Sequence, residues 1–502
     1  MNHIVIYPIL IPILTASIAL IAFKNRDLQR WISVIGSTLT FISTCVLLYA
    51  VHTDGIQVLQ PGNWEAPFGI SLVADLFSAL MVCVTGLMAM TISIYSLGDV
   101  DERRESFGFQ PLFQILIFGV IGAFLTGDLF NLYVWFEVML ITSFVLLAIG
   151  NGKAQLDGAV KYVIINLLSS LIFLAAVGIM YGLTGTLNFA AMAEALQDTE
   201  NTGLVITASM MFMVSFGIKS AVFPLFFWLP ASYHTPPITI TAIFGALLTK
   251  VGVYSLVRVF TLLFTHDIGY THTILLWISV PTMVVGVLGA ASQYDVRKIL
   301  SFHIVSQIGY MIMGLAFFTK IALAGVIYYI LHNILAKTNL FLVAGIAQKL
   351  VGSYHLSRLG GLYKKYPLVS ALFAISAISL AGLPPLTGFW AKYTVIYAGL
   401  EVQQWVVIGF ALAVGLMTLF SMTKIWMGAY WSPLPDTAPV VADKNFKPVA
   451  GAQLIALMLP TIVIAGFIVV LGIFGEPFYM LLFDAAEQLL DPSMYINAVL
   501  NP

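Results

Sequence analysis

The sequence predicts an all-α polytopic membrane protein of about fourteen transmembrane helices. The first reason is composition: 60% of the 502 residues are apolar and 9% are charged, whereas soluble chains carry about 25% charged residues. The second is that the apolar residues fall in successive runs of about 20, the length that crosses a bilayer. With a mean hydropathy of +0.98, the chain cannot be a soluble globular enzyme. Its solvent must be lipid.

The apolar runs are joined by short connections and form one membrane domain without a linker. We expect spans at 4–23, 31–51, 72–97, 110–127, 129–149, 159–183, 204–229, 237–264, 272–291, 299–318, 321–348, 368–399, 402–431 and 451–474. Two stretches between or after the spans, 187–200 and 478–490, are amphipathic. Both are expected to lie on the surface or against a neighbour.

The basic residues orient this predicted bundle, because lysine and arginine concentrate in cytoplasmic loops. Alternate loops hold 15 of the 22 basic residues, namely Lys24, Arg26, Arg30, Arg103, Arg104, Lys153, Lys161, Arg297, Lys298, Lys349, Arg358, Lys364, Lys365, Lys444 and Lys447. The other loops hold Lys320 and acids such as Asp54, Glu65, Glu194, Asp198 and Glu200. The first set is therefore expected to be cytoplasmic. An even number of spans then places both termini outside.

Composition and motifs also exclude several kinds of ligand. A net charge of −1 argues against nucleic acid, which binds basic surfaces. The chain has no CxxC, HExxH, GxGxxG or Walker-type run, so we expect no flavin, iron–sulfur cluster, nucleotide or metal site. The two cysteines, Cys45 and Cys83, lie inside apolar runs and are expected to be small packing residues.

Six basic residues remain inside the predicted spans: Lys219, Lys250, Arg258, Lys337, Lys392 and Lys424. Arg258 and Lys424 come late in their spans and are expected to reach the membrane surface with their charged ends. The other four are deep; Lys250, for example, is about 18 Å into its span at 1.5 Å per residue. Glu137 is the one deep acid, about 12 Å in.

A charge at that depth costs at least about 2.5–3.5 kcal/mol, so it needs a function or a partner. One interpretation is a structural ion pair in which Glu137 and a lysine join two helices. However, four deep lysines face a single deep acid, so most of them lack a carboxylate. A buried lysine without one can bind and release protons near neutral pH. A row of such groups indicates a proton relay.

Two of the deep lysines lie beside predicted helix breaks. Lys219 precedes Pro224 in FGIKSAVFPLFFWLP, and Lys392 follows Pro384 and Pro385 in SLAGLPPLTGFWAKY. Interrupted helices at matching positions point to an inverted repeat and to an ion path. The breaks fall in the seventh and twelfth spans. This spacing predicts five-helix repeats at 110–264 and 272–431, after three helices in 1–109 and before a last helix and an amphipathic tail in 451–502.

Histidines extend the set of candidates. His332 and Lys337 share one span in YYILHNILAKTNLF, where Asn333 lies one turn from Lys337 on the same face. His332 is expected to join the relay, although a hydrogen-bonded packing role remains open. His234, beside TPP, and His303, in SFHIVSQIGY, are weaker candidates of the same kind.

These motifs resemble the antiporter-like membrane subunits shared by respiratory complex I and the Mrp (multiple resistance and pH) cation/proton antiporters. The resemblance covers nearly the whole chain. It rests on VWFEVM around Glu137, FGIKSAVFPLFFWLPASYHTPP, GALLTKVGVY, ILSFHIVSQIGYM, HNILAKTNLF and LAGLPPLTGFWAKY. It implies that Glu137 pairs with Lys219 and that Lys250, His332, Lys337 and Lys392 continue the path.

The resemblance further implies a subunit of a hetero-oligomeric Na⁺/H⁺ antiporter in a bacterial plasma membrane. Its partners would be other subunits of the complex, the lipid bilayer, protons and possibly Na⁺, and it would be a transporter subunit without a redox cofactor rather than an enzyme. A proton-pumping membrane subunit of a quinone-reducing or hydrogenase complex is the main alternative. A stand-alone carrier and a structural scaffold are the others.

Overall fold

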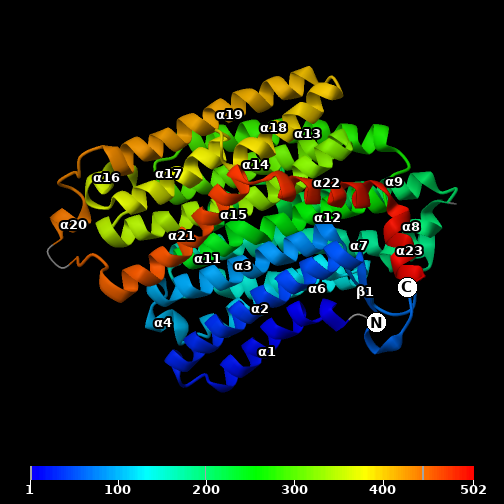
Figure 1. Ribbon diagram of the computed structural model, residues 1–502, viewed down its shortest axis with the longest axis horizontal. Coiled ribbons are helices and arrows are strands. Elements are labelled where there is room, and N and C mark those ends of the chain that lie inside the picture. Colours follow the sequence, from blue (N-terminus) through cyan, green and yellow to red (C-terminus); the bar gives the residue numbers. More distant parts are fainter. Residues whose placement is uncertain (1–2, 198, 444–445, 502) are drawn as a thin grey trace.

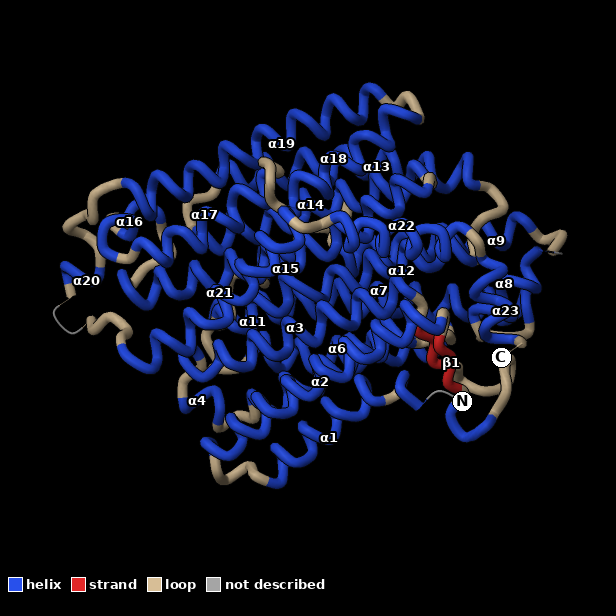
Figure 2. Tube along the Cα trace, in the orientation of Figure 1, coloured by secondary structure: helices blue, strands red, loops and turns tan. Residues whose placement is uncertain are grey.

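The computed structural model describes residues 3–197, 199–443 and 446–501. Within these ranges, eleven helices are long and apolar enough to cross a membrane, and three shorter apolar helices complete the predicted set of fourteen. The helices lie side by side along the long axis of the molecule, as Figure 1 and Figure 2 show. The predicted all-α membrane fold is therefore confirmed.

The bounds of the helices follow the predicted spans closely. The first eight spans are α1 (Tyr7–Ile21), α2 (Arg26–Asp54), α3 (Leu76–Asp99), α5 (Phe109–Leu125), α6 (Leu129–Ala148), α7 (Lys153–Thr184), α9 (Thr202–Ser220) with α10 (Trp228–Ser232), and α11 (Ile238–Ile243) with α12 (Thr249–Leu262). The last six are α13 (Ile268–Ser292), α14 (Val296–Phe317), α15 (Lys320–Val351), α17 (Pro367–Ala381) with α18 (Thr387–Glu401), α19 (Trp405–Ile425) and α21 (Gly451–Ile473).

Shorter elements lie at the ends of the bundle or, in the case of α22 (Glu476–Leu490), against its central helix α15. The two predicted amphipathic stretches form α8 (Phe189–Gln197) and α22, and α23 (Pro492–Leu500) follows. The small helices α4 (Glu102–Glu105), α16 (Leu362–Lys365) and α20 (Pro439–Ala442) lie in loops. A hairpin of β1 (Gln57–Leu59) and β2 (Leu72–Ala74) pairs antiparallel. The sequence did not predict this hairpin, since its three-residue strands are too short to show a pattern.

The seventh and twelfth spans are broken, as predicted. The seventh is interrupted between α9 and α10 by a segment that contains Pro224, and the twelfth between α17 and α18 by one that contains Pro384 and Pro385. Gly382 ends α17 with a φ of +89°, and a Cβ there would lie 2.6 Å from the Lys392 Cδ atom. Glycine is needed at this position both for its backbone conformation and for its small size.

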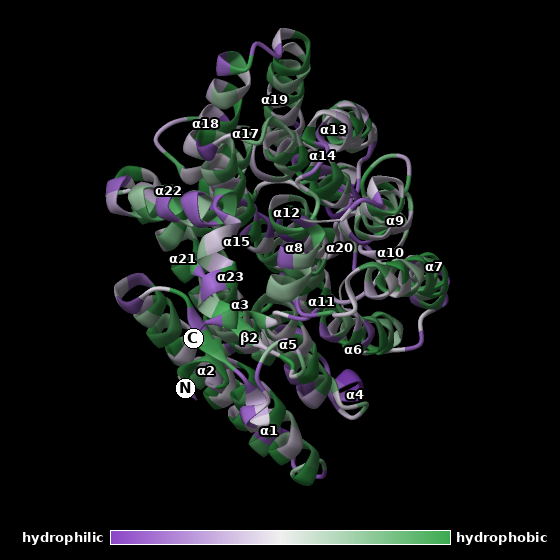
Figure 3. Cartoon of the chain, turned by 90° about the vertical axis from the view of Figure 1, so that its right-hand side faces the viewer, coloured by the Kyte–Doolittle hydropathy of each residue, from purple (hydrophilic) through white to green (hydrophobic). Residues whose placement is uncertain are grey.

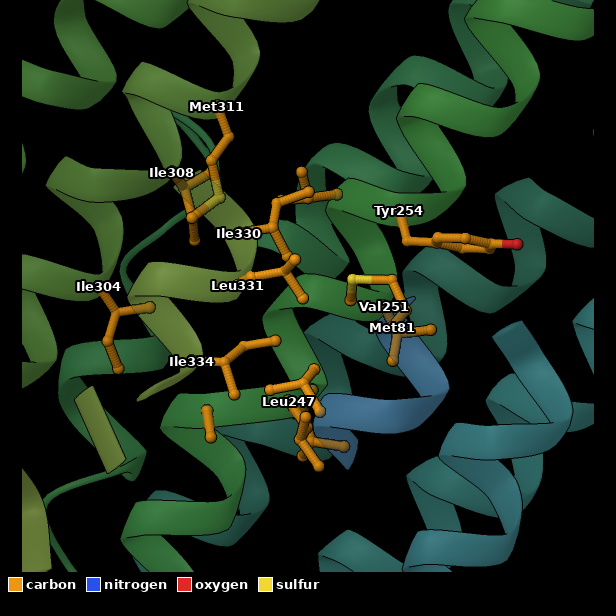
Figure 4. Packing of buried hydrophobic residues seen from close by; sticks show 14 of the residues in the cluster. Met81, Leu247, Val251, Tyr254, Ile304, Ile308, Met311, Ile330, Leu331 and Ile334 are labelled. Carbon is orange, nitrogen blue, oxygen red and sulfur yellow. The ribbon is translucent and has the colours of Figure 1, made fainter. Parts of the chain in front are cut away.

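Helix α15 forms the centre of the bundle. It packs against α14, α17, α18, α21 and α22, and the most apolar part of its 32 residues is fully buried. Figure 4 shows Ile330, Leu331 and Ile334 of α15 beside residues from neighbouring helices. Hydrophobic residues dominate the outer helices, and hydrophilic ones gather at turns and ends (Figure 3). The buried polar groups of α15 are thus shielded from lipid by a layer of helices.

The loops sort to the two ends of the bundle as the charge pattern requires. Ion pairs between Arg30 of α2 and Glu105 of α4 and between Lys349 of α15 and Asp99 of α3 join helix ends at the end of the bundle that carries α4, α16 and α20. Both termini lie at the opposite end (Figure 1). Lys444 and Asp198, which contributed to the charge pattern, lie outside the described residues.

Candidate functional site

The Glu137 and Lys219 side chains come from neighbouring helices, α6 and α9. Lys219 is 6% exposed; its Nζ donates to Ser170 Oγ at 3.2 Å and lies 4.6 Å from the centre of the Phe136 ring. Glu137 is half-buried, and its Oε1 has no protein partner. Phe136, which contacts the lysine, is the residue directly before Glu137 in the chain. Among the described residues, however, Glu137 forms no ion pair within 4.0 Å, so the pair is near but not in contact.

A small cavity continues inward from Lys219. Its volume is about 20 Å³, and Tyr162, Asn166 and Tyr233 line it with Lys219. A site needs about 10–15 Å³ by this measure to hold a water. The cavity therefore has room for one water beside the lysine. Leu248, two residues before Lys250, lines the same cavity and links it to the next charged group.

Lys250 lies at the point where the eighth span changes its winding. A π-helix, Phe244–Leu248, separates α11 from α12, and single turns of this kind are frequent at functional sites. Lys250 is fully buried, and its Nζ donates to the Gly245 carbonyl at 2.7 Å. The hydroxyl of the adjacent Thr249 has no partner. The lysine is thus held by a neutral backbone group, and no carboxylate of the described residues is bonded to it.

Lys337 and His303 meet between α14 and α15. Lys337 is fully buried and donates from Nζ to the Leu300 carbonyl at 3.2 Å. His303 is also fully buried; its Nε2 lies 2.9 Å from Ser421 Oγ of α19, and its Nδ1 has no partner. Helix α15, which carries Lys337, packs both on the π-helix beside Lys250 and on α18, which carries Lys392. Lys337 therefore lies on the helix that joins the surroundings of these two lysines.

His332 and Lys392 lie at the break of the twelfth span. The Nδ1 of His332 is 2.9 Å from Thr387 Oγ1, at the start of α18, and its Nε2 has no partner. Lys392 donates from Nζ to the carbonyls of Leu380 and Ala381 at 3.1 and 2.9 Å. These are the last carbonyls of α17, where the helix dipole attracts a cation. The helix break thus supplies the binding site for the lysine.

His234 lies apart from the deep row. It is half-buried in the loop between α10 and α11, and its Nδ1 is 2.8 Å from the Pro230 carbonyl. Burial, and after it the charge of Lys298, lowers the pKa of His234. Lys298 belongs to the basic loops, so His234 is at that end of the molecule. The structure therefore places His234 in a loop at that end rather than within a span.

Among the described residues, several of the buried polar atoms without a protein partner lie beside these charged groups. Besides those of the charged groups, they include Ser220 Oγ, Tyr233 OH, Gln307 Nε2 and both amide atoms of Asn333. Buried polar groups in proteins are almost always hydrogen-bonded to protein or to ordered water. These atoms therefore mark sites for water between the charged groups. Ser220, Tyr233 and Gln307 were not predicted as candidate site residues. The signal that could have identified them is a polar residue in the middle of a predicted span.

The two basic residues expected to reach the membrane surface, Arg258 and Lys424, have different surroundings. Arg258 is 5% exposed and forms a two-bonded ion pair with Asp75 at 2.6 and 2.9 Å, so that prediction is wrong for it. Its partner comes from the start of α3, and the pair joins α3 to α12. Lys424 instead donates to the carbonyls of Ala291 and Gln293 at the end of α13.

The two cysteines, from α2 and α3, face each other with a distance of 3.9 Å between the sulfur atoms. Both are free, half-buried thiols between the two helices. In the part of the chain that the structure describes, no group of three or more His, Cys, Asp or Glu side chains could hold a metal ion.

Comparison with known proteins adds independent information. Residues 126–418 match the family model described as NADH:quinone oxidoreductase/Mrp antiporter, TM. The chain is 45% identical over its whole length, and over all of the relative's, to the D-type subunit of the Na⁺/H⁺ antiporter of Alkalihalophilus pseudofirmus. It is 39% identical, with the same complete coverage, to the corresponding D-type antiporter subunit of Bacillus subtilis. Among solved structures, a chain of the Mrp complex from Dietzia sp. DQ12-45-1b matches with a TM-score of 0.89 and 32% identity, and each chain is covered completely.

Proposed function

Because the chain belongs to the family of membrane subunits shared by NADH:quinone oxidoreductases and Mrp antiporters, we propose that it is the D-type subunit of a Na⁺/H⁺ antiporter complex. In this proposal it carries protons along the row formed by Glu137, Lys219, Lys250, Lys337, His332 and Lys392. His303 is a side branch of the row, and His234 lies near its mouth. The complex supplies the remaining subunits of the antiporter.

The observation that carries the proposal is the chemistry of the four lysines. Each bonds to a neutral hydroxyl or carbonyl oxygen, as described above, and no described carboxylate forms an ion pair with any of them. A lysine held in this way can exist with or without its proton, whereas one in a tight buried ion pair is fixed in the charged form. The row therefore has the protonation freedom that transfer requires.

Movement along the row follows from charge. When Glu137 is ionised and near Lys219, it stabilises the proton on that lysine; protonation of Glu137 or separation of the two removes this attraction. Each unit by which the pKa of a relay group changes corresponds to about 1.4 kcal/mol. Farther along, like charges on Lys250, Lys337 and Lys392 repel one another, so a proton that arrives on one neighbour favours release from the next. Water held by the unpartnered polar atoms would bridge the gaps.

The same proposal fixes the arrangement in the membrane. The end with the basic loops faces the cytoplasm, and both termini lie outside in a bacterial plasma membrane. The two broken spans and their lysines occupy corresponding places in repeats at 110–264 and 272–431. No step requires a redox cofactor in this chain. A proton-pumping subunit of a redox complex would use the same row, but the relatives named above at 39% identity and more are antiporter subunits.

Inverted vesicles from a strain without other Na⁺/H⁺ antiporters test the proposal. The whole complex is expressed with its partner subunits, and respiration builds a ΔpH that a fluorescent dye reports. Addition of Na⁺ should restore the fluorescence with the wild-type chain and should not with Lys219→Ala. Lys424→Ala is the matched control, because it removes a lysine from the end of a span and should leave exchange intact. Normal exchange with Lys219→Ala would contradict the proposal, and copurified iron–sulfur subunits would favour the redox alternative.

A further inference from the structure

A vestibule opens at the end of the bundle that carries the termini. Its volume is about 290 Å³, and it lies between α9 and the loop that joins α12 to α13. Its walls combine polar residues with apolar ones, namely Thr202, Ser209, His266, Asp267 and Thr271 with Val205, Ile206 and Phe264. A cavity of this size has room for water, and the polar side chains give that water hydrogen-bond partners. It therefore brings an aqueous phase, with two titratable side chains at its edge, into the first half of the bundle.

A column of phenylalanine rings separates this vestibule from Lys219. Phe264 lines the vestibule and contacts Phe212, with 5.6 Å between ring centres. Phe212 stacks on Phe216 at 5.6 Å, and Phe216 on Phe136 at 5.9 Å. Phe173 fills the side of the column, 5.6 Å from Phe212 and 5.0 Å from Phe216. All five rings are at most 4% exposed.

The inner end of the column is the relay itself. Phe136 lines the cavity of about 20 Å³ that also contains Lys219, and its ring centre is 4.6 Å from the Lys219 Nζ. Two cavities with polar side chains in their walls are thus joined by an unbroken series of ring contacts. None of the rings offers a hydrogen bond to water, and apolar constrictions of this kind block conduction by excluding it.

We propose that this phenylalanine column is a dry barrier that keeps protons in the vestibule from reaching Lys219 directly. The inference rests on the proposed relay and adds a boundary to it. A proton that passed from the vestibule to Lys219 would cross half of the membrane without moving along the row. The column prevents this uncoupled leak, while Phe136 at its inner end also faces the charge of Lys219.

The first test measures access with cysteines. In a complex with Cys45→Ala and Cys83→Ala, Ser209→Cys reports the vestibule and Leu140→Cys the inner cavity, which Leu140 lines. Ag⁺, a thiol-reactive ion small enough for a cavity that holds one water, is added from the side of the termini. It should label Ser209→Cys with the column intact, and should label Leu140→Cys only when Phe212→Ala is also present. Failure to label Ser209→Cys, or labelling of Leu140→Cys behind the intact column, would overturn the proposal.

The second test measures the leak in inverted vesicles without added Na⁺. Phe212→Ala should reduce the respiration-driven ΔpH signal at least twofold, and adding Lys219→Ala should restore it, because the leak ends at that lysine. Phe113→Ala is the matched control, since Phe113 is equally buried but lies on α5 outside the column. Phe212→Leu keeps the site apolar, so this variant should not leak protons.

Outcomes of the two tests remain distinguishable from failure of the transport proposal. The labelling does not depend on transport, and Na⁺-dependent exchange by the wild-type chain in the same vesicles tests transport separately. If Phe212→Ala is not inserted at wild-type levels, Phe173→Val opens the side of the same column. A full ΔpH signal in an inserted column variant, with Leu140→Cys still unlabelled, would refute the barrier.

Discussion

Replacing a carboxylate by its amide should have opposite consequences at Asp75, which is buried, and at Glu137, which is half-buried. The change is nearly isosteric and keeps hydrogen-bonding capacity, so it removes only the charge. At Asp75 it leaves Arg258 without its two charge-assisted bonds, at 2.6 and 2.9 Å, in a site where the arginine is 5% exposed. At Glu137 it removes the negative charge near Lys219, but the Lys219 Nζ keeps its hydrogen bond to Ser170 Oγ.

The magnitude follows from what each remaining cation can do. Arginine cannot lose its proton in a protein, so Asp75→Asn leaves a buried charge uncompensated at a cost of about 3–5 kcal/mol. Asparagine can still cap α3, as Asp75 does by accepting a hydrogen bond from the Ser78 amide. The expected loss of stability therefore does not come from a lost helix cap. Lys219 can instead release its proton. Glu137→Gln should therefore change the free energy of unfolding by at most about 0.5 kcal/mol, as substitutions without a packing or pairing effect do.

The assay combines thermal stability of the purified complex with Na⁺-driven proton movement in inverted vesicles. Asp75→Asn should lower the melting temperature and keep activity per folded complex, and Arg258→Gln in the same chain should recover part of the loss. Glu137→Gln should melt like the wild type and be inactive, while Glu137→Asp should retain part of the activity. Normal transport by Glu137→Gln, or a loss of stability equal to that of Asp75→Asn, would refute the reasoning.

Four further predictions concern the row and its setting. Lys250→Ala should abolish exchange at normal protein levels, and Lys250→Arg should not rescue it, because arginine keeps its proton; full activity of the arginine variant in the vesicle assay would show that charge alone suffices. Gly382→Ala should lower the free energy of unfolding by about 1–2 kcal/mol, because its backbone is left-handed; the melting temperature measures this effect. It should also reduce Na⁺/H⁺ exchange in the vesicle assay, because the new Cβ would lie 2.6 Å from the Lys392 Cδ atom. Asn333→Leu should leave the melting temperature unchanged or higher and slow exchange, since neither amide atom has a protein partner; a stability loss without a change in rate would mean a packing role. Cysteine in place of Lys364 should react with impermeant reagents only from the cytoplasmic side, and labelling from outside would invert the proposed orientation.

Local properties of the sequence determine most of the architecture. Runs of apolar residues about 20 long must form helices in lipid, because every backbone amide has to be bonded within its own segment. The prolines at 224, 384 and 385 remove such bonds, so the broken seventh and twelfth spans were predictable, as was the depth of Lys219 and Lys392. The charge difference between alternate loops is likewise a property of the sequence alone.

Tertiary structure decided which groups meet. Arg258 was expected to reach the membrane surface, but helix packing buries it against Asp75, 183 positions away in the chain. Packing also keeps Glu137 and Lys219 out of direct contact and places His332 against Thr387 at the second helix break. These outcomes depend on the rotation of each helix about its axis and on which neighbours it contacts. Spacing along one helix does not contain that information, because partners on different helices are fixed only when the whole bundle packs.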